Sequence, residues 1–200
     1  MLRPRRNMAT DENLVRHSIR LRGYDYSLPG AYFVTICTYQ RKCVLADIYG
    51  GQLRLTETGR IAQKCWAEIP AHSHQVYIDV YVIMPNHIHG ILGITDRPRK
   101  RQLPGIPALA PGSLAAVVRA FKSATTRRRN LLETVSEPLW QRNYYEHVVR
   151  NQKSLETIRA YICANPLKWP SDPDNPAIQG RFSDEVEELL EVGSTFENGL

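Results

Sequence analysis

Residues 76–94, VYIDVYVIMPNHIHGILGI, constrain the fold more than any other stretch of the chain. Val76–Met84 is rich in β-branched and aromatic residues, a composition that predicts a strand. Pro85-Asn86 interrupts this pattern, and His87–Ile94 predicts a second strand that pairs antiparallel with the first. We therefore expect an antiparallel sheet that contains both strands.

The other predicted elements alternate between strands and helices around these two. Apolar and β-branched runs predict strands at Ala31–Tyr39 and Tyr144–Val149, and a hairpin of Cys43–Leu45 with Gln52–Leu55 around Gly50-Gly51. Apolar periodicity predicts helices at Thr56–Ile69 and Ser113–Arg128. A last helix is predicted to be capped by Ser154 and to end at Asn165, before Pro166. Two helices on one face of a mainly antiparallel sheet are typical of a ferredoxin-like α+β fold. The C-terminal helix, which contains a tyrosine, is additional to that fold.

Charge divides the chain unevenly along its length. The 200 residues carry 26 Lys and Arg against 20 Asp and Glu, a net charge of +6. Residues 1–167 carry a net charge of +12, whereas residues 168–200 carry a net charge of −6. We predict a basic N-terminal arm at 1–29, one folded domain at 30–168, and a loosely attached Pro-rich, then acidic, tail at 169–200 with a short helix at Asp184–Val192.

Several classes of protein are excluded by composition. No stretch approaches the roughly 20 apolar residues of a membrane span, and no apolar region follows the basic start as it would in a signal peptide. The four cysteines form no CxxC pair, which argues against a zinc ribbon or a thioredoxin-like site. We expect a cytoplasmic protein with reduced thiols.

His87 and His89 are the first candidates for chemistry. Side chains at positions i and i+2 of a strand point to the same face, so both imidazoles can converge on one cation while Ile88 points to the core. The structural alternative is two polar positions on a solvated face. The apolar sequence on both sides favours the metal-binding interpretation.

Tyr161 and Asn165 lie four residues apart on the last predicted helix and therefore share one face. The Asn165 amide oxygen is a candidate third ligand for a hard divalent cation. A phenolic oxygen beside such a cation is a competent nucleophile toward phosphorus. A tyrosine that packs at the edge of the core is the alternative.

A run of basic residues without acidic ones lies between the histidine strand and the tyrosine helix. Between Arg97 and Leu132 there are nine basic residues: Arg97, Arg99, Lys100, Arg101, Arg119, Lys122, Arg127, Arg128 and Arg129. Such a run can be a solvated face, but the absence of counter-charge over 36 residues favours binding of phosphates. Arg142 comes next among Trp140, Tyr144 and Tyr145, a pattern that suits stacking on unpaired bases.

Four segments together resemble the REP-associated tyrosine transposases, a branch of the single-tyrosine HUH transposases and nucleases. The segments are YVIMPNHIHGIL, SLAAVVRAFKSATTRRRN, LWQRNYYEHVVRN and AYICANPLKW. By this resemblance His87 and His89 match the paired metal ligands, Tyr161 matches the nucleophile and Asn165 matches the amide ligand. The resemblance also implies Mg²⁺ or Mn²⁺ as cofactor, single-stranded or hairpin DNA as partner, and action as a monomer or homodimer. It further implies a bacterial protein that is associated with the nucleoid.

The activity implied is endonuclease and strand-transfer chemistry at DNA hairpins by metal-assisted transesterification. Tyr161 would form a 5′-phosphotyrosine bond and release a 3′-hydroxyl, which later attacks that bond and rejoins the strands. Two alternatives remain at this point: a non-catalytic, domesticated module that binds hairpin DNA, and a phosphodiesterase that uses a metal-bound water.

Overall fold

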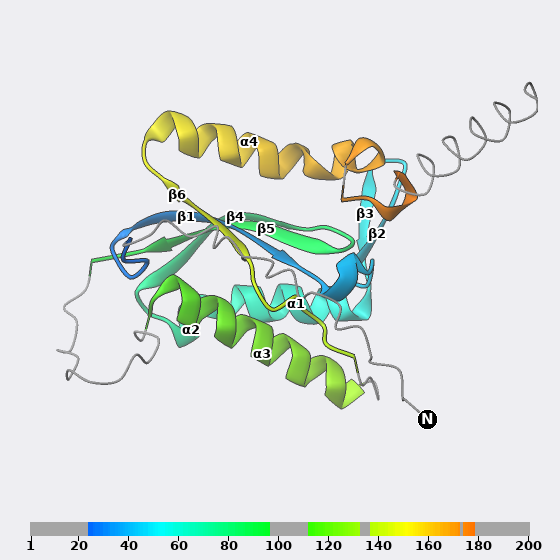
Figure 1. Ribbon diagram of the computed structural model, residues 1–200, viewed down its shortest axis with the longest axis horizontal. Helices are drawn as coiled ribbons and strands as arrows, with labels where there is room; N and C mark the ends of the chain where they lie inside the picture. The colour runs from blue at the N-terminus through cyan, green and yellow to red at the C-terminus, as the bar shows by residue number, and fades with distance from the viewer. Residues whose placement is uncertain (1–23, 97–111, 133–136, 173, 179–200) are drawn as a thin grey trace, which may run out of the picture.

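A computed structural model describes residues 24–96, 112–132, 137–172 and 174–178 of the chain (Figure 1). Its elements, in chain order, are β1 (Gly30–Cys37), the 3-10 turn η1 (Tyr39–Arg41), β2 (Ala46–Tyr49), β3 (Gln52–Leu55), α1 (Glu57–Ala67), α2 (Ile69–His72), β4 (Val76–Ile83), β5 (His87–Ile94), α3 (Leu114–Leu132), β6 (Tyr145–Val149), α4 (Gln152–Lys168) and the 3-10 turn η2 (Trp169–Ser171). Four strands form an antiparallel sheet in the order β4-β5-β1-β6, and β2 pairs with β3 in a separate hairpin. The predicted α+β class and antiparallel sheet are confirmed.

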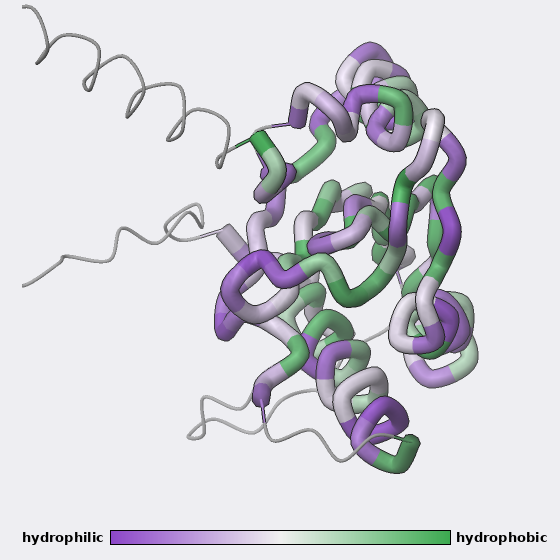
Figure 2. The backbone as a smooth tube through the Cα atoms, turned by 90° about the vertical axis from the view of Figure 1, so that its right-hand side faces the viewer, coloured by the Kyte–Doolittle hydropathy of each residue, from purple (hydrophilic) through white to green (hydrophobic). Residues whose placement is uncertain are grey.

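The helices lie in two layers on either side of the sheet. In Figure 1, α1 and α3 lie below the sheet and α4 lies above it; Figure 2, turned by 90°, shows the same separation. The two predicted helices on one face are therefore α1 and α3, and the additional C-terminal helix, α4, covers the opposite face.

The core lies between the sheet and the α1–α3 layer because every second residue of the central strands points there. Ile36 from β1 and Ile88 from β5 are fully buried on that side together with Trp66 of α1. The Trp66 ring meets Phe121 of α3 edge to face, with ring centroids 5.1 Å apart. Gly90 leaves room for this tryptophan, since a Cβ atom at that position would lie 2.5 Å from the indole ring.

The hairpin of β2 and β3 begins later than predicted. Its first strand is Ala46–Tyr49 rather than Cys43–Leu45. Gly50 and Gly51 both have positive φ, so they form a two-residue turn that places Tyr49 directly opposite Gln52. This pairing reaches Ala46 opposite Leu55 and leaves Cys43–Leu45 as the connection from η1.

Both predicted limits of α4 are wrong. The helix is capped by Asn151, whose Oδ1 accepts a hydrogen bond from Ser154 N at 2.8 Å, and it continues through Pro166 to Lys168. A proline inside a helix lacks the N–H that would bond to the carbonyl four residues earlier. Here the helix tolerates it because only two helical residues remain before the chain turns at the buried Trp169.

A polar contact fixes α4 to the edge strand β4. The pairing of β4 with β5 shifts register between Ile78 and Tyr81, an irregularity that contains Asp79. Arg159 of α4 donates to Asp79 Oδ2 through Nε at 2.9 Å and Nη2 at 2.8 Å.

The described start of the predicted tail packs on the rest of the molecule. Asp174 O accepts a hydrogen bond from Asn86 Nδ2 at 2.7 Å, and its carboxylate pairs with Arg41. This part is therefore not loosely attached. The helix expected at Asp184–Val192, most of the basic loop at 95–112, and residues 1–23 of the arm lie outside the described residues, and the domain limits stay predictions. Among the helices that the structure describes, none is long and apolar enough to cross a membrane.

Candidate metal and tyrosine site

His87 and His89 lie on the face of β5 that α4 covers, with their ring centroids 4.4 Å apart. Their alternation with Ile88 results from the two-residue period of a strand. Both are buried, so the alternative of a solvated face is wrong. Two imidazoles side by side under a helix need a polar environment to be stable there.

Hydrogen bonds determine which nitrogen of His87 carries the proton. Asn86 Nδ2 donates to Arg41 O and to Asp174 O, which leaves Asn86 Oδ1 as an acceptor. His87 Nδ1 lies 2.8 Å from this oxygen and therefore donates to it. His87 Nε2 then carries a lone pair, and it is buried without a hydrogen-bond partner.

His89 joins the strand to the candidate nucleophile. Its Nδ1 lies 2.9 Å from Thr35 Oγ1, and its Nε2 lies 3.2 Å from the hydroxyl of Tyr161. With Nδ1 donating to the threonine, the tyrosine hydroxyl donates to Nε2. The structure thus brings Tyr161 of α4 next to the histidine strand. The tyrosine side chain is 42% exposed, so solvent and a ligand can reach it.

Asn165 lies one turn after Tyr161 and is buried. Its Oδ1 has no hydrogen-bond partner, as is the case for His87 Nε2. Such orphaned buried acceptors are rare because each costs roughly 1–3 kcal/mol. Two of them in one site are explained if both serve as ligands for a cation.

The environment keeps both histidines neutral. The pKa of His87 is lowered to about 4, mainly by burial and also by the charge of Arg41, whereas Asn165 acts in the opposite direction. The pKa of His89 is lowered to about 3, mainly by burial and also by His87 and Arg41, with Asp174 opposing. Neutral imidazole is the form that binds metals.

The Tyr161 hydroxyl is not activated by the protein alone. Burial raises its pKa; Asn165 lowers it, whereas Asp172 and Asp174 raise it. A nucleophilic phenolate at neutral pH therefore needs a further positive charge.

A divalent cation fits the donor set. His87 Nε2, His89 Nε2 and Asn165 Oδ1 are neutral donors on one side of the sheet, and His87 Nδ1–H is held by an amide oxygen, as is usual for metal-binding histidines. The described residues contain no group of three or more His, Cys, Asp or Glu arranged for a metal, so the set depends on the amide of Asn165.

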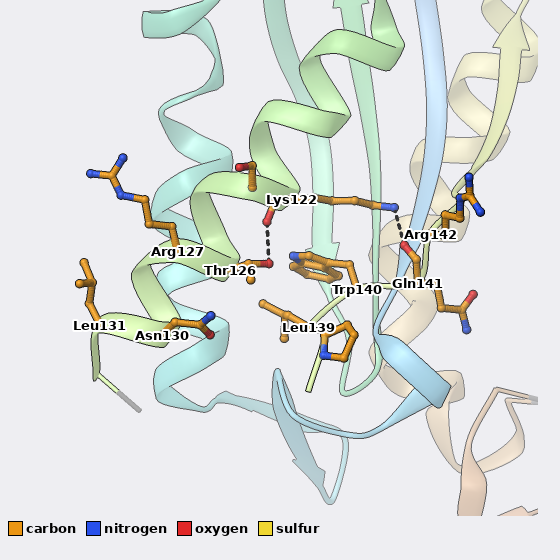
Figure 3. A pocket seen from close by; sticks show the side chains of 11 residues that line it. Lys122, Thr126, Arg127, Asn130, Leu131, Leu139, Trp140, Gln141 and Arg142 are labelled. Atoms are coloured by element: carbon orange, nitrogen blue, oxygen red, sulfur yellow. Dashed lines mark hydrogen bonds between the residues drawn. The ribbon is translucent and has the colours of Figure 1, made fainter. Parts of the chain in front are cut away.

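The basic residues predicted to bind DNA are distributed differently. Arg97, Arg99, Lys100 and Arg101 lie outside the described residues. Three of the other basic residues are engaged in contacts within the protein. Lys122 donates to Gln141 O and Asn143 O, both at 2.9 Å. Arg128 pairs with Glu68, and the buried Arg129 donates to Glu137 O. The exposed members are Arg119, Arg127 and Arg142. Figure 3 shows Arg127 and Arg142 at the two ends of an open groove of about 720 Å³ between α3 and residues 138–142.

This groove does not lie beside Tyr161, because α3 and α4 cover opposite faces of the sheet (Figure 1). The structure therefore brings together Tyr161, His87, His89 and Asn165, and places the described basic residues of α3 elsewhere. Residues 141–145 connect the two regions, since Gln141 and Asn143 contact Lys122 and Tyr145 begins the edge strand β6.

Sequence reasoning missed the residues that orient the histidines. Asn86, Thr35 and the Arg41–Asp174 pair hold or surround the imidazoles. The position of Asn86 directly before His87 was the available indication. Thr35 had none, since its partner His89 is 54 residues away in the chain.

Comparisons with known proteins find a relative in sequence and solved structures of similar fold. No protein-family model matches the chain. An uncharacterized protein of Haemophilus influenzae is 37% identical over 165 residues, which cover 78% of this chain and 91% of that protein. The solved structure of a REP-associated tyrosine transposase bound to a REP hairpin aligns with a TM-score of 0.53 and 20% identity, covering 74% of this chain and 73% of that one. At this identity the alignment establishes a shared fold.

Proposed function

The chain belongs to the same family as the Haemophilus influenzae protein, and we propose that it is a transposase-like enzyme that cleaves and rejoins single-stranded DNA at hairpins. Tyr161 is the nucleophile, and His87, His89 and Asn165 hold a divalent cation. The fold shared with a tyrosine transposase bound to a hairpin supports this class of substrate.

One observation carries the proposal. Two orphaned acceptors, His87 Nε2 and Asn165 Oδ1, accompany a tyrosine hydroxyl that lies 3.2 Å from His89 Nε2. A module that only binds DNA has no need of buried, unpartnered acceptors, whose cost requires compensation. A local loss of stability of this kind is typical of functional sites, where the requirements of function outweigh those of stability.

In the proposed reaction Tyr161 Oη attacks a backbone phosphorus. The new O–P bond forms as the bond from phosphorus to the 3′ oxygen breaks; the phenolic proton goes to solvent, and the leaving oxygen takes up a proton as a 3′-hydroxyl. One phosphodiester replaces another, so no external energy source is needed, and the reverse attack rejoins the strand. Without the cation, His89 Nε2 accepts a hydrogen bond from the Tyr161 hydroxyl, 3.2 Å away. When the cation takes that lone pair, the hydroxyl would lie beside the cation, close to the phosphate that it attacks.

The bound cation would supply positive charge to the non-bridging phosphate oxygens and to the phenolate. Imidazole nitrogens suit Mn²⁺ better than Mg²⁺, whereas the amide oxygen of Asn165 accepts either. We therefore expect activity with both ions and stronger binding of Mn²⁺.

The test is a covalent adduct. The full chain is incubated with Mn²⁺ and a labelled DNA hairpin that has randomised unpaired flanks, and the products are separated under denaturing conditions. We expect a protein–DNA adduct that Tyr161→Phe abolishes and that the matched variant Tyr77→Phe, at an exposed tyrosine of β4, retains.

Two other outcomes would overturn the proposal. Cleavage without any adduct would indicate a hydrolase that uses a metal-bound water. Binding of the hairpin without cleavage, at all concentrations of Mn²⁺ and Mg²⁺, would indicate a non-catalytic binding module.

A further inference from the structure

A second groove lies beside the tyrosine, between the edge strand β6 and the first half of α4. Its volume is about 550 Å³, and it is open to solvent. This volume falls in the range of about 300–1,000 Å³ that is typical of ligand sites. Its lining consists of Phe33, Tyr145, His147, Asn151, Lys153, Ser154, Thr157 and Ile158.

Aromatic rings connect this groove to the metal and tyrosine site. Phe33 contacts His89 at 5.4 Å, Tyr161 at 6.2 Å and Tyr145 at 6.3 Å, measured between ring centroids. The sheet register explains the arrangement, because Thr35 is paired with both His89 and Tyr145. Tyr145, which lines the groove, is therefore separated from the candidate ligand His89 by a single strand, β1.

Tyr145 is an exposed aromatic residue in the lining of this groove. It is 43% exposed although it belongs to a strand of the central sheet. An exposed aromatic ring in a groove is a common platform for an unpaired base, because every base has a stacking face.

The polar lining suits a nucleotide rather than a cationic or purely apolar ligand. Lys153 is the one Lys or Arg of the groove, and no acidic side chain lines it. Lys153 is exposed at the start of α4, where the helix N-terminus also favours an anion.

We infer that this groove is a subsite for one unpaired base next to the phosphate that Tyr161 attacks, with the base stacked on Tyr145. The inference rests on the proposed function and adds to it the groove and the side chain that would hold the nucleotide next to the cleaved phosphate. It also gives a path for the strand: residues 141–145 lead from the groove of α3 to Tyr145 at the sheet edge.

Binding of hairpin DNA by Tyr145 variants tests the subsite. Affinity is measured in EDTA, so that no cleavage occurs, with the randomised-flank hairpin and with the same hairpin trimmed to its paired stem. We expect Tyr145→Ala to weaken binding of the flanked hairpin about 5- to 100-fold and to leave the trimmed stem unaffected. Tyr145→Phe, which keeps the ring, should restore binding of the flanked hairpin.

Tyr77→Ala is the matched control, because Tyr77 is similarly exposed and lies on the opposite edge strand, β4. Equal losses for Tyr77→Ala and Tyr145→Ala would overturn the inference, as would a loss for Tyr145→Ala that is the same with and without flanks. A base analogue whose fluorescence is quenched by stacking, placed at each flanking position in turn, should report quenching at one position that Tyr145→Ala abolishes.

Failure of this inference is distinguishable from failure of the proposed function. If Tyr145→Ala binds flanked hairpins normally while the Tyr161-dependent adduct still forms, the subsite is wrong and the enzyme assignment stands. If flanked DNA shows Tyr145-dependent binding but no adduct forms, the subsite stands as a binding site and the catalytic assignment is wrong.

Discussion

The two faces of the sheet are built from alternate residues of the same strands, yet they differ in chemistry. On β5, Ile88 and Leu92 point into the apolar layer with α1 and α3, whereas His87 and His89 point toward α4. Along its whole length α4 buries only Ile162 and Asn165. One face is therefore an ordinary core, and the other is a thinly covered polar site.

The difference indicates a division of roles between adjacent residues. The apolar face contributes hydrophobic stabilisation in proportion to the area that it buries. The α4 face includes neutral buried imidazoles and orphaned acceptors, each of which reduces stability. Substitutions on the core face should therefore change stability, and those on the α4 face should change chemistry, even one position apart.

Ile88→Ala should have the largest effect on stability. Ile88 is fully buried between the two histidines in sequence but on the opposite face. Its truncation should lower the free energy of unfolding by about 2–5 kcal/mol, through lost transfer energy and a residual cavity. Urea denaturation monitored by circular dichroism measures this. A cost under about 1 kcal/mol would contradict the assignment of this face as the stabilising core.

Thr35→Val should affect the chemistry of the α4 face. The substitution keeps the shape but removes the hydroxyl that lies 2.9 Å from His89 Nδ1. We expect Mn²⁺ affinity, measured by calorimetry, and the rate of adduct formation to fall about 10- to 100-fold, as for other residues that orient metal-binding histidines. Thr35→Ser, which retains an acceptor, should restore both. If Thr35→Val changes stability but not Mn²⁺ affinity, Thr35 is only structural.

Lys122 tests whether the basic run serves the fold or DNA. Burial lowers the pKa of Lys122 to about 8, against an ordinary value of 10.5, with Cys37 opposing. Between these two pH values the unfolded chain retains a proton that the folded chain has released, so the contribution of Lys122 to stability rises with pH. The stability of the wild type relative to Lys122→Met should therefore increase from about pH 8 to about pH 10.5.

Urea unfolding of the wild type and of Lys122→Met between about pH 8 and about pH 10.5 measures this difference in stability. We expect it to be smaller than the effects of Ile88→Ala and Thr35→Val. A difference independent of pH, together with a large loss of hairpin affinity at neutral pH in Lys122→Met, would instead assign Lys122 to DNA binding.

Local sequence patterns predicted most of the fold. The runs that form β1, β4 and β5 are β-branched and aromatic, and the apolar periodicity of α1 and α3 is helical, so each element is evident within its own residues. The hairpin and α4 limits were missed because the effect of a two-glycine turn, or of a proline near a helix end, depends on how the neighbouring residues pack.

The candidate site was predictable as far as it is local. His87 with His89, and Tyr161 with Asn165, share faces through the periods of a strand and a helix. The tautomer of His87 was not predictable, because it is fixed by Asn86 contacts to Arg41 and Asp174, 45 and 88 residues away in the chain. Composition likewise could not reveal that Lys122, Arg128 and Arg129 are engaged in contacts within the protein.

The irregularity in β4 has a consequence for how α4 is set on the sheet. With so little apolar surface buried, hydrophobic contact alone does not determine the rotation of this helix about its own axis. A helix turns by about 100° per residue, so a shift of one position would present Ala160 or Ile162 in place of the tyrosine. Asp79, which lies within the register shift, binds Arg159 two residues before Tyr161. The contact between Asp79 and Arg159 therefore restrains the rotation at which the Tyr161 hydroxyl lies 3.2 Å from His89 Nε2.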